Sequence, residues 1–220
     1  MAEGPDPSAL GMGPDTDPID RTRFPVDEWR LVECLPVRST LGRDETLFAV
    51  GNGYLGMRGN PTEGRDAHTH GTFVNGFHET WEIKHPEAAY GFAKTGQTIV
   101  NVPDAKLMKI YVDDEPLLLA TADLQHYERS LDMREGILRR EIVWITPSRK
   151  KVRIRTSRMV SFTERHLAVM TMEIEMLEGD APVVVSSQIL NRQDGTDEYY
   201  AAEAAMGEGF DPRKSGTFEH

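Results

Sequence analysis

The chain has 220 residues and a formal net charge of −11, and this length can bury the core of one large all-β domain or two small ones without disulfides. The negative charge repels phosphate backbones, which argues against nucleic acid as a partner. The sequence shows neither the pattern of a secretory leader nor the run of about 18 apolar residues that a membrane span needs. The single cysteine, Cys34, has no partner within the chain, so we expect a reducing, cytoplasmic location.

The first 23 residues predict a disordered tail. They contain four prolines and three glycines but few large apolar side chains, and such a composition does not offset the entropy lost on ordering. We expect one domain over residues 24–220, with its first apolar anchors near Trp29.

Short β-rich runs separated by turn residues follow as far as about residue 190, which is typical of antiparallel strands. The clearest is Ile137–Ile145, in which Leu138, Arg140, Ile142 and Trp144 share one face and both faces carry apolar groups. The other predicted strands are 107–112, 115–119 after a turn at Asp113 and Asp114, 152–156, 166–177 and 182–190.

Together these runs predict an antiparallel meander. Because no amphipathic helix of ten or more residues lies between them, a mainly β fold with a sandwich of two sheets is favoured over a βαβ architecture. The one helical candidate is 197–206, which lacks a wide apolar stripe and has a mobile loop as its alternative.

The segment 51–60 contains a literal dinucleotide motif, Gly51-Asn-Gly-Tyr-Leu-Gly56. The motif requires a helix that opens at its third glycine, and Gly59 and Pro61 would break such a helix, so we expect no nucleotide site. A sharply folded loop remains, with the alternatives of a docking or ligand surface and of a tight corner between strands without a partner. As a surface it would present Asn52, Tyr54, Arg58 and Asn60.

The histidines near residue 70 and the many acidic residues identify no reaction centre. His68, His70, His78 and His85 lack a cysteine or a second spaced pair that would complete a metal site, so no metal or other cofactor is expected. Pairs drawn from 36 acidic residues do not reveal a general acid, whose pKa depends on its pocket. We therefore expect no catalytic residue within this chain.

Two aromatic residues form a second candidate site. Trp81 and Tyr90 flank Glu82, and ring faces can stack on a pyranose while polar groups bind its hydroxyls. Such rings are also ordinary core material. A sugar contact by Trp81 and Glu82 is thus one hypothesis, and a structural role is the other.

An ordered set of motifs over about residues 24–190 resembles the N-terminal region of glycoside hydrolase family 65, the maltose, trehalose and kojibiose phosphorylases with their hydrolase relatives. Each motif alone is weak evidence for the family, but the whole set in this order is specific to it. The main matches are Phe48-Ala-Val-Gly-Asn-Gly-Tyr-Leu-Gly-Met-Arg-Gly-Asn60, Gly71-Thr-Phe-Val-Asn-Gly-Phe77, Asn101-Val-Pro-Asp104, Leu131-Asp-Met-Arg134 and Arg165-His-Leu-Ala168.

The resemblance implies a super-sandwich of the galactose-mutarotase type, incomplete at its C-terminal end, that precedes an (α/α)6 catalytic barrel of the same polypeptide. In the family a glutamic acid on the barrel protonates the glycosidic oxygen of an α-glucoside. Inorganic phosphate or water is the acceptor. By this resemblance the chain alone is inactive, and its partners are the barrel, α-glucosides and a second copy. The alternative is a self-standing carbohydrate-binding sandwich module.

Overall fold

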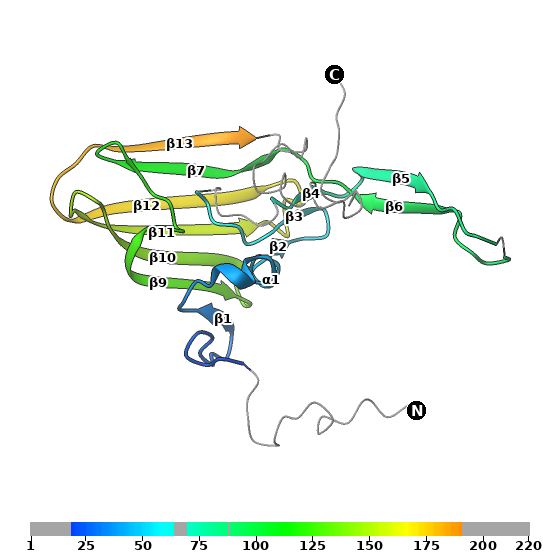
Figure 1. Ribbon diagram of the computed structural model, residues 1–220, viewed down its shortest axis with the longest axis horizontal. Coiled ribbons are helices and arrows are strands. Elements are labelled where there is room, and N and C mark those ends of the chain that lie inside the picture. Colours follow the sequence, from blue (N-terminus) through cyan, green and yellow to red (C-terminus); the bar gives the residue numbers. More distant parts are fainter. Residues whose placement is uncertain (1–18, 64–69, 88, 191–220) are drawn as a thin grey trace, which may run out of the picture.

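The computed structural model describes residues 19–63, 70–87 and 89–190 (Figure 1). The predicted helix at 197–206 lies outside these residues. In chain order the elements are β1 (Arg30–Glu33), the 3-10 turn η2 (Arg38–Thr40), α1 (Leu41–Leu47), β2 (Val50–Gly51), β3 (Leu55–Met57), β4 (Thr72–Val74), β5 (His78–Glu82), β6 (Thr95–Ile99), β7 (Asp104–Val112), β8 (Glu115–Pro116), β9 (Asp123–Asp132), β10 (Ile137–Ile145), β11 (Lys151–Val160), β12 (Ala168–Glu178) and β13 (Val183–Leu190).

The larger layer is a five-stranded antiparallel sheet in the order β1-β9-β10-β11-β12. Strands β9 to β12 follow one another as a meander. The predicted strands 137–145, 152–156 and 166–177 correspond to β10, β11 and β12, and β10 has the predicted bounds, whereas β9 was not among the predicted strands. In the middle of the sheet Ile142 lies opposite Tyr127 on one side and Ile154 on the other. The face of β10 that carries Leu138, Ile142 and Trp144 is buried.

The last strand departs from the predicted meander. After β12 the chain crosses to the other layer, where β13 pairs with β7 and Val183 lies opposite Val112. Pro182 has no N–H with which to continue a ladder, and its carbonyl instead accepts a hydrogen bond from Asp113. The expectation that 182–190 extends the same sheet is therefore wrong.

The hairpin of β7 and β8 confirms the predicted turn. Asp113 and Asp114 have φ angles of 54° and 63°, the pair of positive values that a type I′ turn requires. The returning strand is shorter than expected, with bounds Glu115–Pro116, although the Leu117 N–H still donates to the Ile110 carbonyl.

The two layers pack as a sandwich and enclose two apolar clusters. One cluster joins β7 and β8 to β10 and β11 through Ile110, Leu117, Ile142 and Val152. The other lies under α1 and β2 and includes Phe48, Val50, Leu138 and Val160. The mainly β sandwich expected from the sequence is thus confirmed.

Helix α1 was not predicted, and its burial explains why. Its seven residues bury Asp44 and Glu45, whereas Leu47 is 45% exposed. A helix that turns its carboxylates inward has no apolar stripe for a periodicity search to find.

The boundary predicted for the tail also needs a correction. Residues 19–23 belong to the described part of the chain, and Arg23 is buried. Because the guanidinium of Arg23 binds two buried carboxylates, these residues belong with the domain rather than with a tail.

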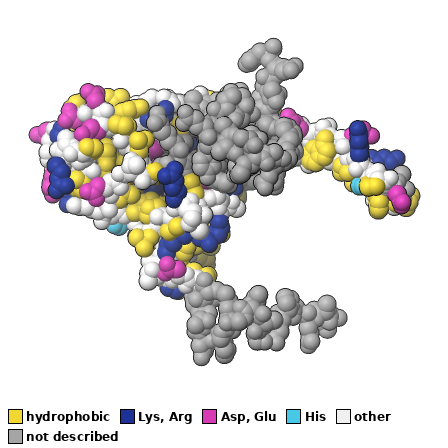
Figure 2. Space-filling model, viewed as in Figure 1, with side chains coloured by type: hydrophobic (Ala, Val, Ile, Leu, Met, Phe, Trp, Pro, Cys, Tyr) yellow, Lys and Arg dark blue, Asp and Glu magenta, His cyan; other side chains and the backbone are white. Residues whose placement is uncertain are grey.

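Strands β5 and β6 pair with each other and form an arm, residues 78–99, that extends away from both layers (Figure 1). Figure 2 shows hydrophobic side chains beside charged ones along this arm. Within the described ranges, no helix has the length and hydropathy needed to cross a membrane.

Candidate functional site

The glycine-rich segment forms the turn between β2 and β3 and the strand β3 itself, in a small three-stranded sheet of order β2-β3-β4, and Asn52 closes this turn. The Asn52 Oδ1 accepts hydrogen bonds from the backbone of Tyr54 and Leu55, at 2.9 Å each. Its Nδ2 donates to the carbonyls of Ser161 and Arg165, at 2.6 and 3.0 Å. Asn52 therefore ties the turn to the loop that precedes β12.

Tyr54 packs on the same loop. Its ring meets the His166 ring edge to face, with centroids 4.6 Å apart, and the Arg165 guanidinium lies 5.1 Å from its centroid. A half-buried ring held by a cation and a second ring is well oriented.

Arg58 points toward α1 rather than into solvent. Its Nη1 donates to the Thr46 hydroxyl at 2.8 Å, and its Nη2 donates to the Gly42 carbonyl at 2.6 Å and lies 3.5 Å from the Glu45 carboxylate. A Cβ on Gly71 would lie 2.0 Å from the Arg58 Cδ. Gly71 thus leaves the space through which the Arg58 side chain passes.

Asn60 is buried at the end of this segment. Its carbonyl accepts a hydrogen bond from Arg158, and the carbonyl of the preceding Gly59 accepts one from Arg129. A Cβ on Gly59 would lie 2.6 Å from the Cβ of Phe48, so only glycine fits this corner.

The glycine-rich segment is thus a brace between α1, the large sheet and the loop before β12. The third glycine of the literal dinucleotide motif, Gly56, lies within β3 and opens no helix. Arg58 and Asn60 act within the fold, and Asn52 and Tyr54 contact the loop at residues 161–166. The geometry favours the tight corner, one of the two alternatives that the sequence left open.

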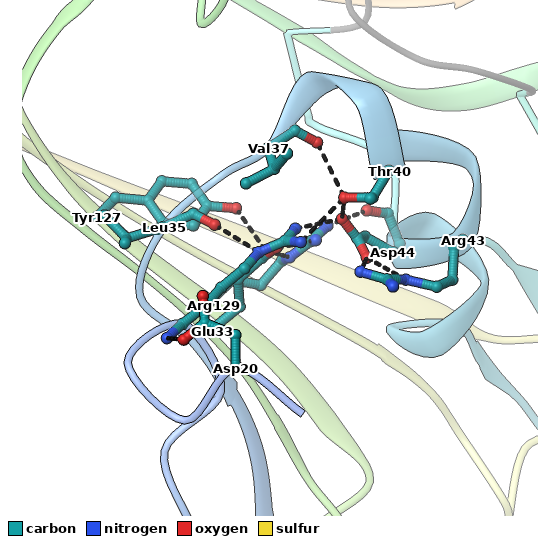
Figure 3. A network of polar contacts seen from close by, with 11 residues as sticks. Asp20, Glu33, Leu35, Val37, Thr40, Arg43, Asp44, Tyr127 and Arg129 are labelled. Atoms are coloured by element: carbon teal, nitrogen blue, oxygen red, sulfur yellow. Dashed lines mark hydrogen bonds and ion pairs between the residues drawn. The ribbon is translucent and has the colours of Figure 1, made fainter. Parts of the chain in front are cut away.

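A buried network of charges lies beside this brace (Figure 3). One carboxylate oxygen of Glu33 lies 2.5 Å from the Arg23 guanidinium, and the other lies 2.6 Å from the Arg129 guanidinium. Arg23 also pairs with Asp44. Burial by itself raises the pKa of Asp44, but hydrogen bonds from Thr40, Arg23 and Arg43 outweigh it and hold this pKa below its usual value.

A second charged group lies at the start of β7. Lys106 Nζ donates to Asp104 at 2.8 Å and to the Thr72 hydroxyl, and His70 Nδ1 lies 3.2 Å from the other Asp104 oxygen. Burial opposes ionisation of Asp104, yet the His70 hydrogen bond and the Lys106 charge hold its pKa well below its usual range. Burial lowers the pKa of Lys106 to about 8, against the opposing effect of Asp104.

Arginines on the core face of the large sheet complete this polar band. Arg140 forms a bidentate pair with Glu63, at 2.5 and 2.9 Å. Arg158 donates to the Arg58 and Asn60 carbonyls, and burial lowers the pKa of Arg158 to about 10. Burial also raises the pKa of Tyr127 to about 12.

This arrangement suits structure better than proton transfer. Every buried carboxylate among the described residues faces a cationic side chain; they are Glu33, Asp44, Glu45, Glu63 and Asp104. A general acid for glycoside cleavage needs a raised pKa, whereas those of Asp44 and Asp104 are lowered. A cavity of 160 Å³ borders Glu33 and Tyr127, and it is smaller than the roughly 300 Å³ at which ligand pockets begin.

The predicted aromatic site lies apart, on the arm. Trp81 is 43% exposed and Tyr90 is fully exposed, and Glu82 belongs to the strand face opposite Trp81. The structure therefore does not bring Trp81, Glu82 and Tyr90 together with the glycine-rich segment into one pocket.

The histidines are also spread over the fold. His70 binds Asp104, His78 begins β5, and His85 packs against Phe92 with ring centroids 4.9 Å apart. His68 lies outside the described residues. Where side chains are described, no three of the residue types that bind metals cluster.

Sequence reasoning missed the network of Arg23, Glu33, Asp44 and Arg129. The sequence did contain a signal for the neighbouring buried pair of Arg140 and its carboxylate partner. Arg140 shares a face with Leu138, Ile142 and Trp144. A charge on an apolar face must be paired when it is buried. Its partner Glu63 is 77 residues away in sequence, so no local pattern names it.

Comparison with known proteins gives a consistent assignment. The model for the glycosyl hydrolase family 65 N-terminal domain matches residues 35–216. An α,α-trehalose phosphorylase of Thermoanaerobacter brockii is 38% identical over 69% of the chain, and an uncharacterized glycosyl hydrolase of Mycobacterium tuberculosis is 35% identical over 80%. A solved structure described as a kojibiose phosphorylase from the human microbiome superposes with a TM-score of 0.62 at 26% identity, covering 70% of this chain and 20% of its own.

The chain spans 20% and 22% of the length of these two sequence relatives, and the part that it shares with them is the sandwich described above. The matched family model, these relatives and the fold agree with the ordered motifs in the sequence. The chain therefore belongs to glycosyl hydrolase family 65, of which it forms the N-terminal domain.

Proposed function

We propose that this chain is the non-catalytic N-terminal sandwich of an enzyme that cleaves an α-linked glucose disaccharide such as maltose, trehalose or kojibiose, with phosphate or water as the acceptor. The observation that carries the proposal is that each of the five buried carboxylates among the described residues pairs with a cationic side chain. A general acid needs a raised pKa, whereas the pKa values of Asp44 and Asp104 are lowered. The catalytic acid then belongs to another domain of the same polypeptide.

The sandwich supports the enzyme by presenting rigid surfaces to that domain. The contacts that we predicted for Asn52, Tyr54, Arg58, Asn60, Trp81 and Glu82, with sugar or with another domain, stay predictions. Pairing of two copies is also part of the proposal. A self-standing binding module is not favoured, since the chain covers only about a fifth of the relatives it matches.

No metal or organic cofactor is part of the proposal, and inorganic phosphate enters only as a co-substrate of the whole enzyme. We propose a cytoplasmic location because Cys34 is a single free thiol. Burial raises the pKa of this thiol. A thiol kept protonated in this way is a poor nucleophile.

The proposal is tested by assaying two proteins, the 220-residue chain and the polypeptide encoded by the whole reading frame. Each is mixed with phosphate and an α-linked diglucoside, and glucose and glucose 1-phosphate are measured. We expect turnover only by the longer protein. Turnover by the 220-residue chain, or a reading frame that encodes no further domain, would contradict the proposal.

A further inference from the structure

The arm at residues 78–99 carries two large apolar side chains on one of its faces. Across its ladder Glu79 lies opposite Thr98, and Trp81 lies opposite Gly96. Side chains alternate along a strand, so Trp81 and Ile83 share one face, the Trp81 face, with the polar side chains of Glu79 and Thr98. Gln97 lies on the opposite face. The arm extends away from both layers (Figure 1).

The Trp81 face is held in a fixed shape. A Cβ on Gly96 would lie 2.3 Å from the Trp81 Cε2, so the indole lies directly across the glycine backbone. The Ile83 N–H donates to the Lys94 carbonyl at 2.8 Å and extends the ladder toward the tip. Trp81 nevertheless remains 43% exposed. A large ring that is ordered before it meets a partner loses little entropy on binding.

The tip adds two more rings. Phe92 packs on His85 but is 51% exposed, and Tyr90 is exposed over its whole surface. Exposed aromatic side chains grouped on a projection commonly anchor an interface. A lone two-stranded hairpin is also only marginally stable in water, so a partner surface would stabilise the arm.

Charge does not select the partner. The charges on the arm nearly balance, although the formal net charge of the whole chain is −11. The charged residues are Glu79, Glu82 and Glu87 on one side of this balance and Lys84 and Lys94 on the other. The contact that we infer for the arm therefore depends on its large apolar side chains and not on its net charge.

The surface that the arm offers consists of four large side chains, those of Trp81, Ile83, Tyr90 and Phe92. It is small compared with the ~800 Å² that each partner buries in stable complexes between separate chains. A contact within one polypeptide needs less area, because the tether supplies an effective concentration in the mM range. The family relatives carry about four-fifths of their length outside the region shared with this chain.

We infer that the Trp81 face and the tip of the arm pack against the part of the same polypeptide that family 65 enzymes carry beyond this domain. The inference rests on the proposed function, because it requires such a part to exist. It assigns the arm as an intramolecular docking element, for which Trp81 and Tyr90 are the anchors.

Hydrogen exchange measured by mass spectrometry tests this inference on the 220-residue chain and on the whole-frame polypeptide. We expect the arm amides, including that of Ile83, to exchange at least about tenfold more slowly in the longer protein. Equal exchange in both proteins would overturn the docking while leaving the activity assay unaffected. A reading frame without a further domain would overturn both proposals.

Two matched variants of the longer protein locate the contact. Ile83→Arg places a charge beside Trp81 on the Trp81 face and should abolish the protection, whereas Gln97→Arg places the same charge on the opposite face of the hairpin and should retain it. Loss in both variants or in neither would contradict the inference. So would protection that appears in the 220-residue chain at higher concentration, which would indicate a second copy, or protection that requires added disaccharide, which would indicate a sugar site.

Discussion

Buried charges are the main feature of this domain at the scale of single residues. The core face of the large sheet carries Arg129, Arg140 and Arg158 between two apolar clusters. Removing a charge from water is costly unless partners compensate for it, and here the partners come from segments far apart in the chain. Glu33, for example, receives Arg129 from 96 residues away. These pairs fix how α1 and the glycine-rich brace sit on the sheet to which β1 belongs.

Asp104 provides a test of this polar band through pH. The pKa of Asp104 is depressed in the folded state. As the pH falls below about 4, this carboxylate binds a proton more readily in the unfolded chain than in the folded one. The stabilisation that ionised Asp104 provides above that pH is therefore lost. We expect Asp104→Asn to cost about 3 kcal/mol at pH 7, because it leaves Lys106 buried without its carboxylate. The difference from the original chain should shrink between pH 5 and pH 3, as followed by urea unfolding.

Glu173→Gln is the control for Asp104→Asn. Glu173 pairs with Arg155 on the exposed face of the sheet, so its substitution should change the free energy of unfolding by less than about 1 kcal/mol. A cost for Asp104→Asn that is independent of pH would contradict the assignment of Asp104 as an ionised buried partner.

At the scale of elements, the glycine-rich brace decides how the small sheet meets α1. The Gly59 N–H donates to the Glu45 carbonyl at 2.8 Å, at the point where its backbone passes Phe48. The sequence identified a sharply folded segment here but left its role open between a surface and a corner. Spacing of glycines shows that the chain bends, whereas the neighbours that fill the bend are known only from the fold.

Two glycines of this segment give a matched pair of substitutions. In Gly59→Ala the new Cβ would lie 2.6 Å from the Phe48 Cβ and 2.7 Å from its carbonyl oxygen, and we expect a loss of about 1–3 kcal/mol. Gly56→Ala meets nothing within 4 Å and should change the free energy of unfolding by less than about 0.5 kcal/mol. Chemical denaturation measures both, and equal costs would show that the corner is not closely packed.

At the scale of the whole molecule, β13 is an edge strand of the sandwich within the described residues. This strand pairs with β7 on one side, and across the described residues the sheet order ends with it. Val184 and Val185 are 53% and 45% exposed. Edge strands rich in apolar side chains template pairing between molecules unless a charge interrupts them.

We therefore expect the 220-residue chain to self-associate through β13, and Val184→Lys to reduce this association. Met133→Lys is the control, since Met133 is 65% exposed in the turn between β9 and β10 and the variant adds the same charge away from the edge. Light scattering after size-exclusion chromatography compares the three proteins. Equal masses for the two variants at matched concentration would exclude association through this edge.

The sequence by itself determined the β class, the meander from β10 to β12, the hairpin turn at Asp113 and Asp114, and the family, because each rests on local alternation, turn chemistry or ordered motifs. Only the tertiary structure decided where β13 pairs, that α1 exists, that Arg23 belongs to the core, and which groups Arg58 and Asn60 contact within the domain. Those outcomes depend on contacts between residues distant in sequence, and the free energy of pairing a buried charge is set by the partner that folding brings to it.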